Sequence, residues 1–246
     1  MTSTTALVVG GTGTMGTRIV RALAARTGTV VRVLTRNPSS ERARGLVENT
    51  PGDIRPVRGD LDDEQSLKTA FQGVDQVFCN TDFFATASPQ QEYAQGLRAL
   101  HAPQRARLPD GGEGLVFALP LGRAGRWPLI ALDDIAFFAR HQLDHWDDWG
   151  GRTLRIAADA LTGDQIAAAF EKATGVPSVY QAVDLDEFSR SLPGIGHDLA
   201  AMFAFFQDHD LFSRDRDPQA LRALHPELAT FGDWLTTTGW DGAAAG

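Results

Sequence analysis

Residues 5–16 of the chain read TALVVGGTGTMG. The apolar run Thr5–Val9 is typical of a strand that is buried on both faces, as strands of parallel sheets are. Glycines follow at positions 10, 13 and 16, and apolar residues then recur at helical spacing over Met15–Ala25. A strand, a glycine loop and a helix in this order predict the first unit of a Rossmann-type fold.

The glycine spacing also predicts what the loop binds. Glycine allows the tight turn, lets the backbone approach a pyrophosphate, and lets the helix pack close to the sheet. The helix N-terminus adds free N–H groups and the positive end of the helix dipole. The strand–loop–helix context favours this interpretation over a glycine turn without a ligand. The loop residues predicted to contact a dinucleotide are Gly10, Thr12, Gly13, Thr14, Met15 and Gly16.

Arg36 stands 20 residues after Gly16, just past the end of the second expected strand. A site that prefers NAD usually has Asp or Glu there to hold the ribose hydroxyls. A guanidinium can instead pair with a 2′-phosphate. Arg42 and Arg44 are near enough in sequence to assist. We therefore expect NADP(H), with NAD less favoured; the alternative is that Arg36 is a solvated residue at the end of a strand.

Outward from the glycine loop, strands and helices alternate. Further strands are expected at Val30–Leu34, Ile54–Val57 and Gln76–Cys79, with helices at Ser40–Val47 and Glu64–Phe71. This β-α repetition predicts a parallel, doubly wound sheet. The pattern breaks after Tyr93, and His101–Gly114, which is rich in proline and glycine, is predicted to be a loop.

The remaining sequence predicts a second, smaller set of elements. Strands are expected at Leu115–Leu119, Trp127–Leu132, Thr153–Ala157 and Val179–Val183, and helices at Asp133–Trp146 and Thr162–Thr174. Thr162 and Gln165 form a capping-box pattern at the start of the second helix. We thus expect an α/β fold: a Rossmann-like parallel sheet with a small C-terminal α/β lobe. Residues 1–100 would form the nucleotide-binding half and 115–246 the substrate-side lobe, within two domains or one continuous domain.

Composition excludes some classes of partner. The chain has 246 residues, a formal net charge of −8 and a hydrophobic fraction of 43%. Direct nucleic-acid binding is disfavoured, because its affinity comes mainly from phosphate contacts by Lys and Arg. No apolar run approaches the length of a membrane span, and the first residues lack the features of a signal peptide. With Cys79 as the single cysteine, a reducing, cytoplasmic location is expected.

Several stretches together resemble the NmrA-like family, an atypical branch of the short-chain dehydrogenase/reductases. They are LVVGGTGTMG (7–16), VRVLTRNP (31–38), VRGDLDD (57–63), GVDQVFCNTDFF (73–84), IALDDIAFFA (130–139), GRTLRIAADALTGDQIAAAF (151–170) and LHPELATFGDWLTTTGW (224–240). The resemblance implies that Asp60 and Leu61 lie beside the adenine. It also implies that Asn80, Thr81 and Phe83 lie near the nicotinamide.

The chain departs from this family in its middle. Family members continue with a fifth strand, a helix and a sixth strand, whereas here residues 100–109 run almost directly into the later lobe. Without those strands, Gln76–Cys79 would be an edge strand with unpaired backbone groups. Either Leu115–Leu119 folds back to cover it, or a second subunit does, so a homo-oligomer is expected.

Catalytic residues stay unassigned. The usual mechanism of short-chain dehydrogenases needs a Tyr with a Lys four residues later, but Leu97 follows Tyr93 at that spacing and Asp184 follows Tyr180.

His141 and His145 lie one helical turn apart, but no third metal ligand accompanies them, so a solvated helix face is favoured and no metal is expected. We interpret Asp133 and Asp134 as helix-capping residues and Cys79 as a small buried thiol. The aromatic residues predicted to pack the C-terminal helices are Phe203, Phe205, Phe206, Phe212 and Trp234.

Three functions remain open on the sequence alone. The first is an NADP(H)-binding oxidoreductase that acts on a small carbonyl or quinone without a Tyr/Lys pair. The second is a non-catalytic NADP(H)-responsive redox sensor that acts through a protein partner. The third is a shortened structural paralogue, which the intact glycine loop disfavours. The expected partners are a small-molecule substrate or a protein, and neither nucleic acid nor a membrane.

Overall fold

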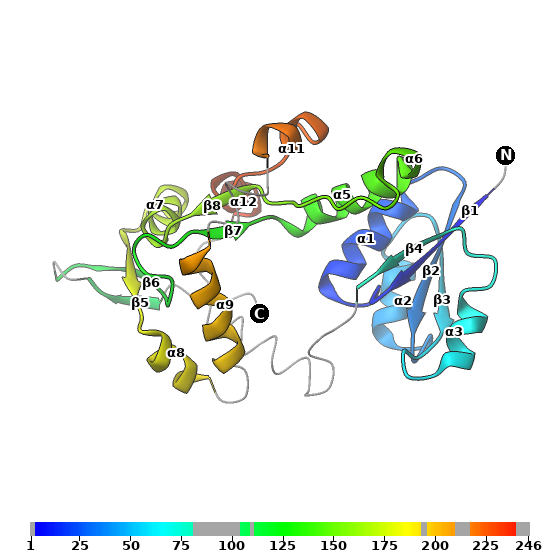
Figure 1. Cartoon of the computed structure of the whole chain (residues 1–246), viewed down its shortest axis with the longest axis horizontal. Coiled ribbons are helices and arrows are strands. Elements are labelled where there is room, and N and C mark those ends of the chain that lie inside the picture. The colour runs from blue at the N-terminus through cyan, green and yellow to red at the C-terminus, as the bar shows by residue number, and fades with distance from the viewer. Residues whose placement is uncertain (1–2, 81–103, 109–110, 193–195, 210–216, 240–246) are drawn as a thin grey trace. The chain divides into compact units, whose positions relative to one another are not determined.

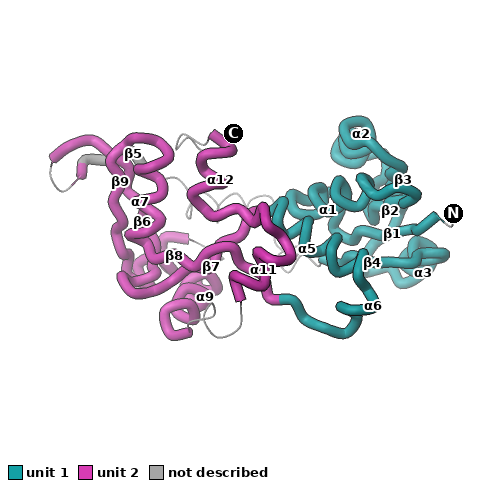
Figure 2. Tube along the Cα trace, turned by 90° about the horizontal axis from the view of Figure 1, so that it is seen from above, with its two compact units in different colours: residues 1–83, 132–154 teal, residues 84–131, 155–246 magenta. Residues whose placement is uncertain are grey.

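The computed structural model describes residues 3–80, 104–108, 111–192, 196–209 and 217–239. The chain forms two compact units. Unit 1 comprises residues 1–83 and 132–154, and unit 2 comprises residues 84–131 and 155–246 (Figure 2). The boundary that the sequence places between residues 100 and 115 stays a prediction, whereas the contacts assign residues 132–154 to unit 1.

Unit 1 contains a four-stranded parallel sheet in the order β3-β2-β1-β4 (Figure 1). Its strands are β1 (Thr4–Val9), β2 (Thr29–Thr35), β3 (Asp53–Arg58) and β4 (Gln76–Cys79). The helices between them are α1 (Thr14–Ala24), α2 (Glu41–Glu48) and α3 (Glu64–Ala70). The parallel Rossmann-like sheet expected from the sequence is therefore confirmed, with every element in its predicted order.

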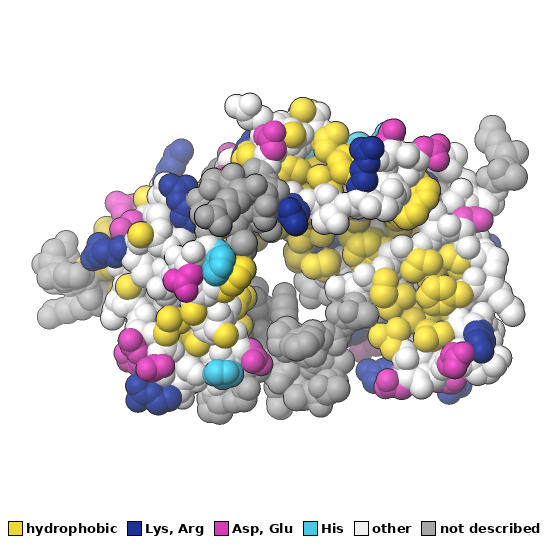
Figure 3. Space-filling view, viewed as in Figure 1, with side chains coloured by type: hydrophobic (Ala, Val, Ile, Leu, Met, Phe, Trp, Pro, Cys, Tyr) yellow, Lys and Arg dark blue, Asp and Glu magenta, His cyan; other side chains and the backbone are white. Residues whose placement is uncertain are grey.

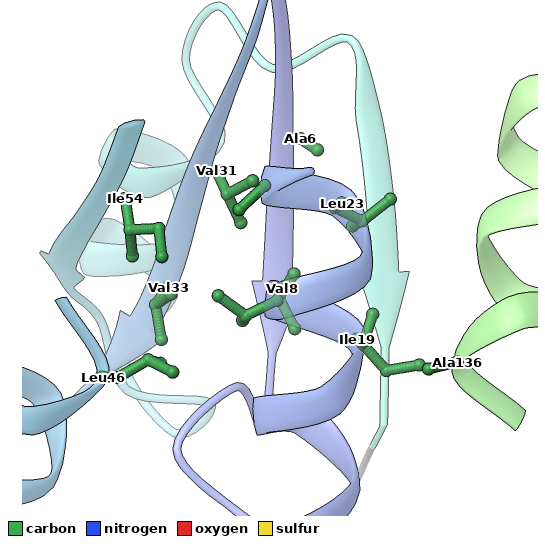
Figure 4. Packing of buried hydrophobic residues seen from close by; sticks show 11 residues of the cluster. Ala6, Val8, Ile19, Leu23, Val31, Val33, Leu46, Ile54 and Ala136 are labelled. Atoms are coloured by element: carbon green, nitrogen blue, oxygen red, sulfur yellow. The ribbon is translucent and has the colours of Figure 1, made fainter. Parts of the chain in front are cut away.

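The central strand β1 is buried on both faces, because its side chains alternate between them. Ala6 and Val8 pack with Ile19 of α1 in one buried cluster, which also includes Leu46 of α2 (Figure 4). Leu7 and Val9 belong to a second cluster on the opposite face, together with Ala70 of α3. This double burial explains why residues 5–9 are a continuous apolar run rather than an alternating one.

A helix from much later in the sequence completes unit 1. Helix α5 (Leu132–Asp144) packs against α1, and its Ala136 joins the cluster of Ile19 (Figure 4). The short helix α6 (Trp146–Trp149) follows, with His145 as its N-cap residue. The single helix expected over Asp133–Trp146 was therefore wrong at its end: it stops at Asp144, and the chain starts a separate turn.

Unit 2 contains a three-stranded sheet in the order β5-β6-β9 and a two-stranded sheet of β7 and β8. The strands are β5 (Gln104–Arg107), β6 (Glu113–Leu119), β7 (Trp127–Leu129), β8 (Asp159–Leu161) and β9 (Ser178–Ala182). The helices are α7 (Gly163–Thr174), α8 (Leu185–Ser191), α9 (Gly196–Asp208), α11 (Pro218–Leu224) and α12 (Phe231–Thr238). The mixed sheet and its helices agree with the expected C-terminal α/β content.

Two sequence-based expectations for unit 2 were wrong, and one of two alternatives is not seen. Within the predicted loop His101–Gly114, residues 104–107 form β5 and pair antiparallel with β6. The strand expected at Thr153–Ala157 does not form; residues 159–161 pair with β7 instead. Of the two coverings weighed for β4, strand pairing by Leu115–Leu119 is not seen, because Leu115–Leu119 pairs with β5 and β9. A strand requires a partner with free backbone groups, and the pattern of a single segment does not reveal where that partner lies.

Other expectations for unit 2 are confirmed. Thr162 and Gln165 form both hydrogen bonds of the capping box at the start of α7. Phe203 is fully buried, and Phe206 packs against the same cluster. Phe205 and Trp234 are more exposed than predicted, and Phe212 lies outside the described residues. Among the helices of the described part of the chain, none has the length and hydrophobicity that a membrane span requires.

Candidate functional site

The carboxyl ends of the four parallel strands bring the predicted site residues to one edge of unit 1. Gly10 follows β1, Arg36 follows β2, Asp60 comes shortly after β3 and Asn80 follows β4. Two backbone hydrogen bonds extend the pairing beyond the strands: Gly59 N donates to Thr35 O at 3.0 Å, and Asn80 N donates to Val9 O at 3.4 Å. Thr81 and Phe83 lie outside the described residues.

Two glycines of the loop are required by the protein's own backbone. Gly10 has a φ of +76°, and a Cβ there would lie 2.8 Å from the carbonyl oxygen of Asn80. A Cβ on Gly16 would collide with the backbone of Gly10 and Gly11. Gly11, which the motif spacing did not single out, is also constrained, because a Cβ there would lie 2.8 Å from Cγ1 of Val33. Gly11 lies against the buried strand residues Val8 and Val33, and this position beside the sheet is the signal that could have identified it.

Gly13 differs from these residues. Among the described residues, a Cβ at this position would meet only the carbonyl oxygen of Gly10, at the ordinary contact distance of 3.4 Å, and Gly13 is exposed. Packing within the part of the chain that the structure describes therefore does not require a glycine here. The position faces open space at the start of α1, where a bound group can approach the backbone.

No side chain of the described residues caps the N-terminus of α1. Its N-cap residue is Gly13, and its first turn contains no acidic residue. The neighbouring helices α2 and α3 begin with the side-chain caps Ser40 and Asp63. The first-turn N–H groups of a helix have no acceptor within the helix. Those of α1, at Thr14, Met15 and Gly16, are consequently available to an anion, and the helix dipole favours one there.

The loop after β2 holds exposed positive charge. Arg36 is exposed, and its guanidinium forms no hydrogen bond or ion pair with the described residues; the same is true of the exposed guanidinium groups of Arg42 and Arg44 on α2. The loop itself is ordered by Asn37, whose N–H donates to the hydroxyl of Thr35 at 3.3 Å. These guanidinium groups are therefore available to an anionic ligand.

The turn after β3 is held by its own hydrogen bonds. The N–H of Asp60 donates to the hydroxyl of Ser66 at 2.9 Å, and a carboxylate oxygen of Asp60 accepts from the N–H of Asp62 at 3.2 Å. Leu61 is 52% exposed, which leaves an apolar surface beside a carboxylate. In such a turn, Leu61 can contact a flat apolar group, and the carboxylate of Asp60 can accept a hydrogen bond from an amino group.

Tyr180 has a structural role in unit 2. Its hydroxyl donates to the carbonyl oxygen of Leu119 at 2.8 Å and accepts from the N–H of Leu121 at 3.3 Å. Burial raises the pKa of this phenol above its ordinary value. A catalytic tyrosine of a dehydrogenase needs a lowered pKa. Tyr180 is thus unsuited to that role, and Tyr93 lies outside the described residues.

The pair formed by His141 of α5 and His145, the N-cap residue of α6, is only partly solvated. His145 is exposed, whereas His141 is half-buried, with Phe137 stacked on its ring. The two imidazole centroids lie 4.3 Å apart, and Nδ1 of His145 is 2.9 Å from the carbonyl oxygen of His141. The pKa of His141 is lowered, mainly by partial burial and to a smaller extent by the charge of His145. The negative charge of Asp144 acts in the opposite direction and raises this pKa. The described part of the chain contains no group of three or more metal-ligating side chains.

Two further candidates are resolved by the structure. Cys79 is exposed at the end of β4, so its expected burial was wrong. Among the described strands β4 lies at one edge of the sheet, and its side chains are covered less than those of β1. Asp133 and Asp134 do lie in the first turn of α5, as predicted. Asp133 additionally pairs with Arg18 of α1 at 2.9 Å, a contact that the sequence pattern did not indicate.

Comparison with family models gives a match to the NmrA-like family. Two ranges of the chain match, residues 2–109 and 92–235. The ranges overlap within residues 92–109, in the middle segment where the sequence places the shortening. The resemblance inferred from the sequence motifs, including the shortened middle, is thereby confirmed.

Solved structures with the same fold include two reductases and a regulator. An NADPH-dependent quinone oxidoreductase from Escherichia coli has 18% identity and a TM-score of 0.69, covering 95% of this chain and 99% of that chain. Triphenylmethane reductase from Citrobacter sp., complexed with NADP(H), has 17% identity and a TM-score of 0.68, covering 96% and 100%. NmrA, a negative transcriptional regulator, in complex with NAD, has 16% identity and a TM-score of 0.69, covering 98% and 99%.

Proposed function

The chain belongs to the NmrA-like family, and from this premise we propose that it binds NADP(H) at the glycine-loop edge of unit 1. The observation that carries the proposal is the start of α1, which has no side-chain cap and no acid in its first turn and follows the exposed Gly13. A pyrophosphate would satisfy the free N–H groups of this helix. The quinone oxidoreductase and the triphenylmethane reductase, which share the fold, are described with NADPH and NADP(H).

The residues present fit such a ligand along its length. The amides of Thr14, Met15 and Gly16 would hold the pyrophosphate, and Arg36 would pair with the 2′-phosphate. Asp60 and Leu61 would contact the adenine. Asn80, at the end of the adjacent strand β4, lies on the side proposed for the nicotinamide.

We propose that the chain acts as an oxidoreductase on a small carbonyl or quinone. Reduced nicotinamide, when bound, supplies a hydride. The chain's own contribution is to hold the dinucleotide at the carboxyl ends of the strands. Solvent supplies the proton, because neither tyrosine has a lysine four residues later. Activity without a Tyr/Lys pair therefore requires a substrate that accepts hydride readily, such as a quinone.

A redox sensor is the second candidate. Two observations favour it: the hydroxyl of Tyr180 is engaged by the backbone, and the regulator NmrA shares the fold. In this function the chain would bind NADP(H), and this binding would change its affinity for a protein partner. The chain would catalyse no reaction. The cytoplasmic location expected for either function stays a prediction.

Calorimetric titration with NADPH, NADP⁺ and NADH tests the binding proposal. We expect tight binding of the NADP forms and weaker binding of NADH. Absence of binding by all three would contradict both functions. Consumption of NADPH with a panel of quinones then separates them: turnover supports the oxidoreductase, and binding without turnover supports the sensor.

We also propose that the chain forms a homo-oligomer through β4. Among the described strands β4 pairs only with β1, and its residue Val77 is 39% exposed. Hydrophobic side chains gather on the surface over the strands of unit 1 (Figure 3). An edge strand with free backbone groups and apolar side chains favours association with a second chain.

A further inference from the structure

A second arginine lies at the edge of the sheet where Arg36 is found. Arg58 is the last residue of β3, and the parallel register places it opposite Thr35, the last residue of β2. The hydrogen bond from Gly59 N to Thr35 O, 3.0 Å long, keeps the two strand ends together beyond the pairing. Arg58 is thus directly beside the residue that precedes Arg36.

The alternation of β3 places Arg58 on the face that α2 covers. Ile54 belongs to the same buried cluster as Leu46 of α2 (Figure 4), whereas Val57 packs against the cluster on the opposite face. Residues two and four positions apart share a face of a strand, so Arg58 shares that of Ile54. Helix α2 begins just after the loop of Arg36, so its first turns, with Arg42 and Arg44, belong to the same edge.

Arg58 differs from the other arginines of these strands in its partners. Arg55, on the same strand, forms two hydrogen bonds with the carboxylate of Asp53, at 2.8 and 2.6 Å. Arg32, on β2, donates to the carbonyl oxygens of Ala70 and Gln72. The guanidinium of Arg58 is exposed and has no hydrogen bond or ion pair with the described residues. Its charge, like that of Arg36, is therefore not neutralised by the part of unit 1 that the structure describes.

We propose that Arg58 is a second determinant of specificity for the 2′-phosphate of NADP(H), acting with Arg36; this inference rests on the proposed function. A phosphate monoester carries a charge of roughly −1.5 to −2 and three acceptor oxygens. One guanidinium pairs with at most two of these oxygens. A second guanidinium, at the end of the neighbouring strand, can pair with the remaining phosphate oxygen. The bound phosphate in turn reduces the electrostatic repulsion between the guanidinium groups of Arg36 and Arg58.

The test compares Arg58→Gln with Arg36→Gln and with Arg55→Gln, a control on the same strand. Dissociation constants for NADPH and NADH are measured by calorimetry, because the two ligands differ only in the 2′-phosphate. Thermal unfolding checks that each variant is folded. We expect Arg58→Gln to weaken NADPH binding about 10-fold, the lower end for a hydrogen bond to a charged group, and to leave NADH binding unchanged. Arg55→Gln should alter neither.

The outcomes distinguish this inference from the proposed function. Equal weakening of NADPH and NADH by Arg58→Gln would show contact with the adenine or a structural effect, and would overturn the inference. No weakening would overturn it as well, while a selective effect of Arg36→Gln would leave the proposed function intact. If the wild-type chain binds neither ligand, the proposed function fails, and the inference fails with it.

Discussion

Arg18 of α1 and Asp133 of α5 form an ion pair, with 2.9 Å between Nη1 and Oδ1, although 115 positions separate them in the sequence. Just past the end of α1, Arg26 pairs with Asp144, the last residue of α5, also at 2.9 Å. Residue numbers increase in the same direction on both helices, so α5 runs parallel to α1. The N-terminus of α5 consequently lies at the end of α1 that begins with the glycine loop.

The two ion pairs should differ in their contribution to stability. Asp133 is 76% exposed, so Asp133→Asn should cost only about 0.2–1 kcal/mol of unfolding free energy. Asp144 is 27% exposed and contacts both Arg26 and Arg140. Asp144→Asn should therefore cost more, about 1.5 kcal/mol. Urea unfolding of the two variants measures the difference, and equal losses would contradict the ranking.

Gly13→Val should abolish nucleotide binding without unfolding the chain. The new side chain would enter the open space before α1, where the pyrophosphate is proposed to approach. In a thermal-shift assay the variant should be stable but should gain nothing from NADPH, because stabilisation by a ligand follows its occupancy.

Gly16→Ala is the matched control. Its Cβ would collide with the backbone of Gly10, so this smaller substitution should reduce stability itself. Full NADPH stabilisation of the Gly13→Val variant would rule out the glycine loop as the binding site.

Arg36→Asp should reverse the nucleotide preference. Loss of the guanidinium removes a charge-assisted contact of about 1.5–3 kcal/mol from NADP(H), and the carboxylate can accept from the ribose hydroxyls of NAD(H). Titration of wild type and variant with both nucleotides measures the change. Equal affinity of the wild type for NADPH and NADH would show that Arg36 does not contact the 2′-phosphate.

His141 should make stability fall in mildly acidic solution. Its pKa is lowered in the folded chain from the ordinary value of 6.5, so the unfolded chain takes up the proton first as the pH falls. Stability then rises with pH between the folded and unfolded pKa values. This loss of stability is absent well above pH 6.5 and appears as the pH falls through that value. It is complete once the pH is below the pKa of His141 in the folded chain.

The matched variant for this effect is His141→Gln, which cannot take up the proton. The difference in unfolding free energy between wild type and variant should change in the variant's favour as the pH falls below 6.5. A difference that is constant with pH would contradict the lowered pKa.

The exposed edge strand predicts a dimer or larger assembly. Light scattering across a dilution series should give a mass above that of the single chain, 26.6 kDa. Substitution of Val77 by Lys should shift the assembly towards monomer, because charge on an edge strand opposes pairing. A monodisperse wild-type monomer with brisk turnover of quinones would contradict the oligomer and favour the plain reductase.

The local sequence determined the parallel sheet of unit 1 and the helices between its strands. The apolar run of residues 5–9, the glycine spacing and the later strand–helix alternation each depend on residues close in the chain, and all appear in the structure as predicted. The same holds for the capping box at Thr162, whose two hydrogen bonds join residues three positions apart. Backbone sterics and short-range hydrogen bonds are sufficient to specify such features.

Only the tertiary structure decided the features that depend on distant partners. Residues 104–107 are a strand because β6 pairs with them, and Thr153–Ala157 is not a strand because β7 pairs with residues 159–161. Cys79 is exposed because β4 is at the edge of the sheet. Likewise Arg58 is placed beside Thr35 by the register of two strands, and Asp133 meets Arg18 by the packing of two helices. Pairing and packing energies belong to both partners, so one segment cannot reveal them alone.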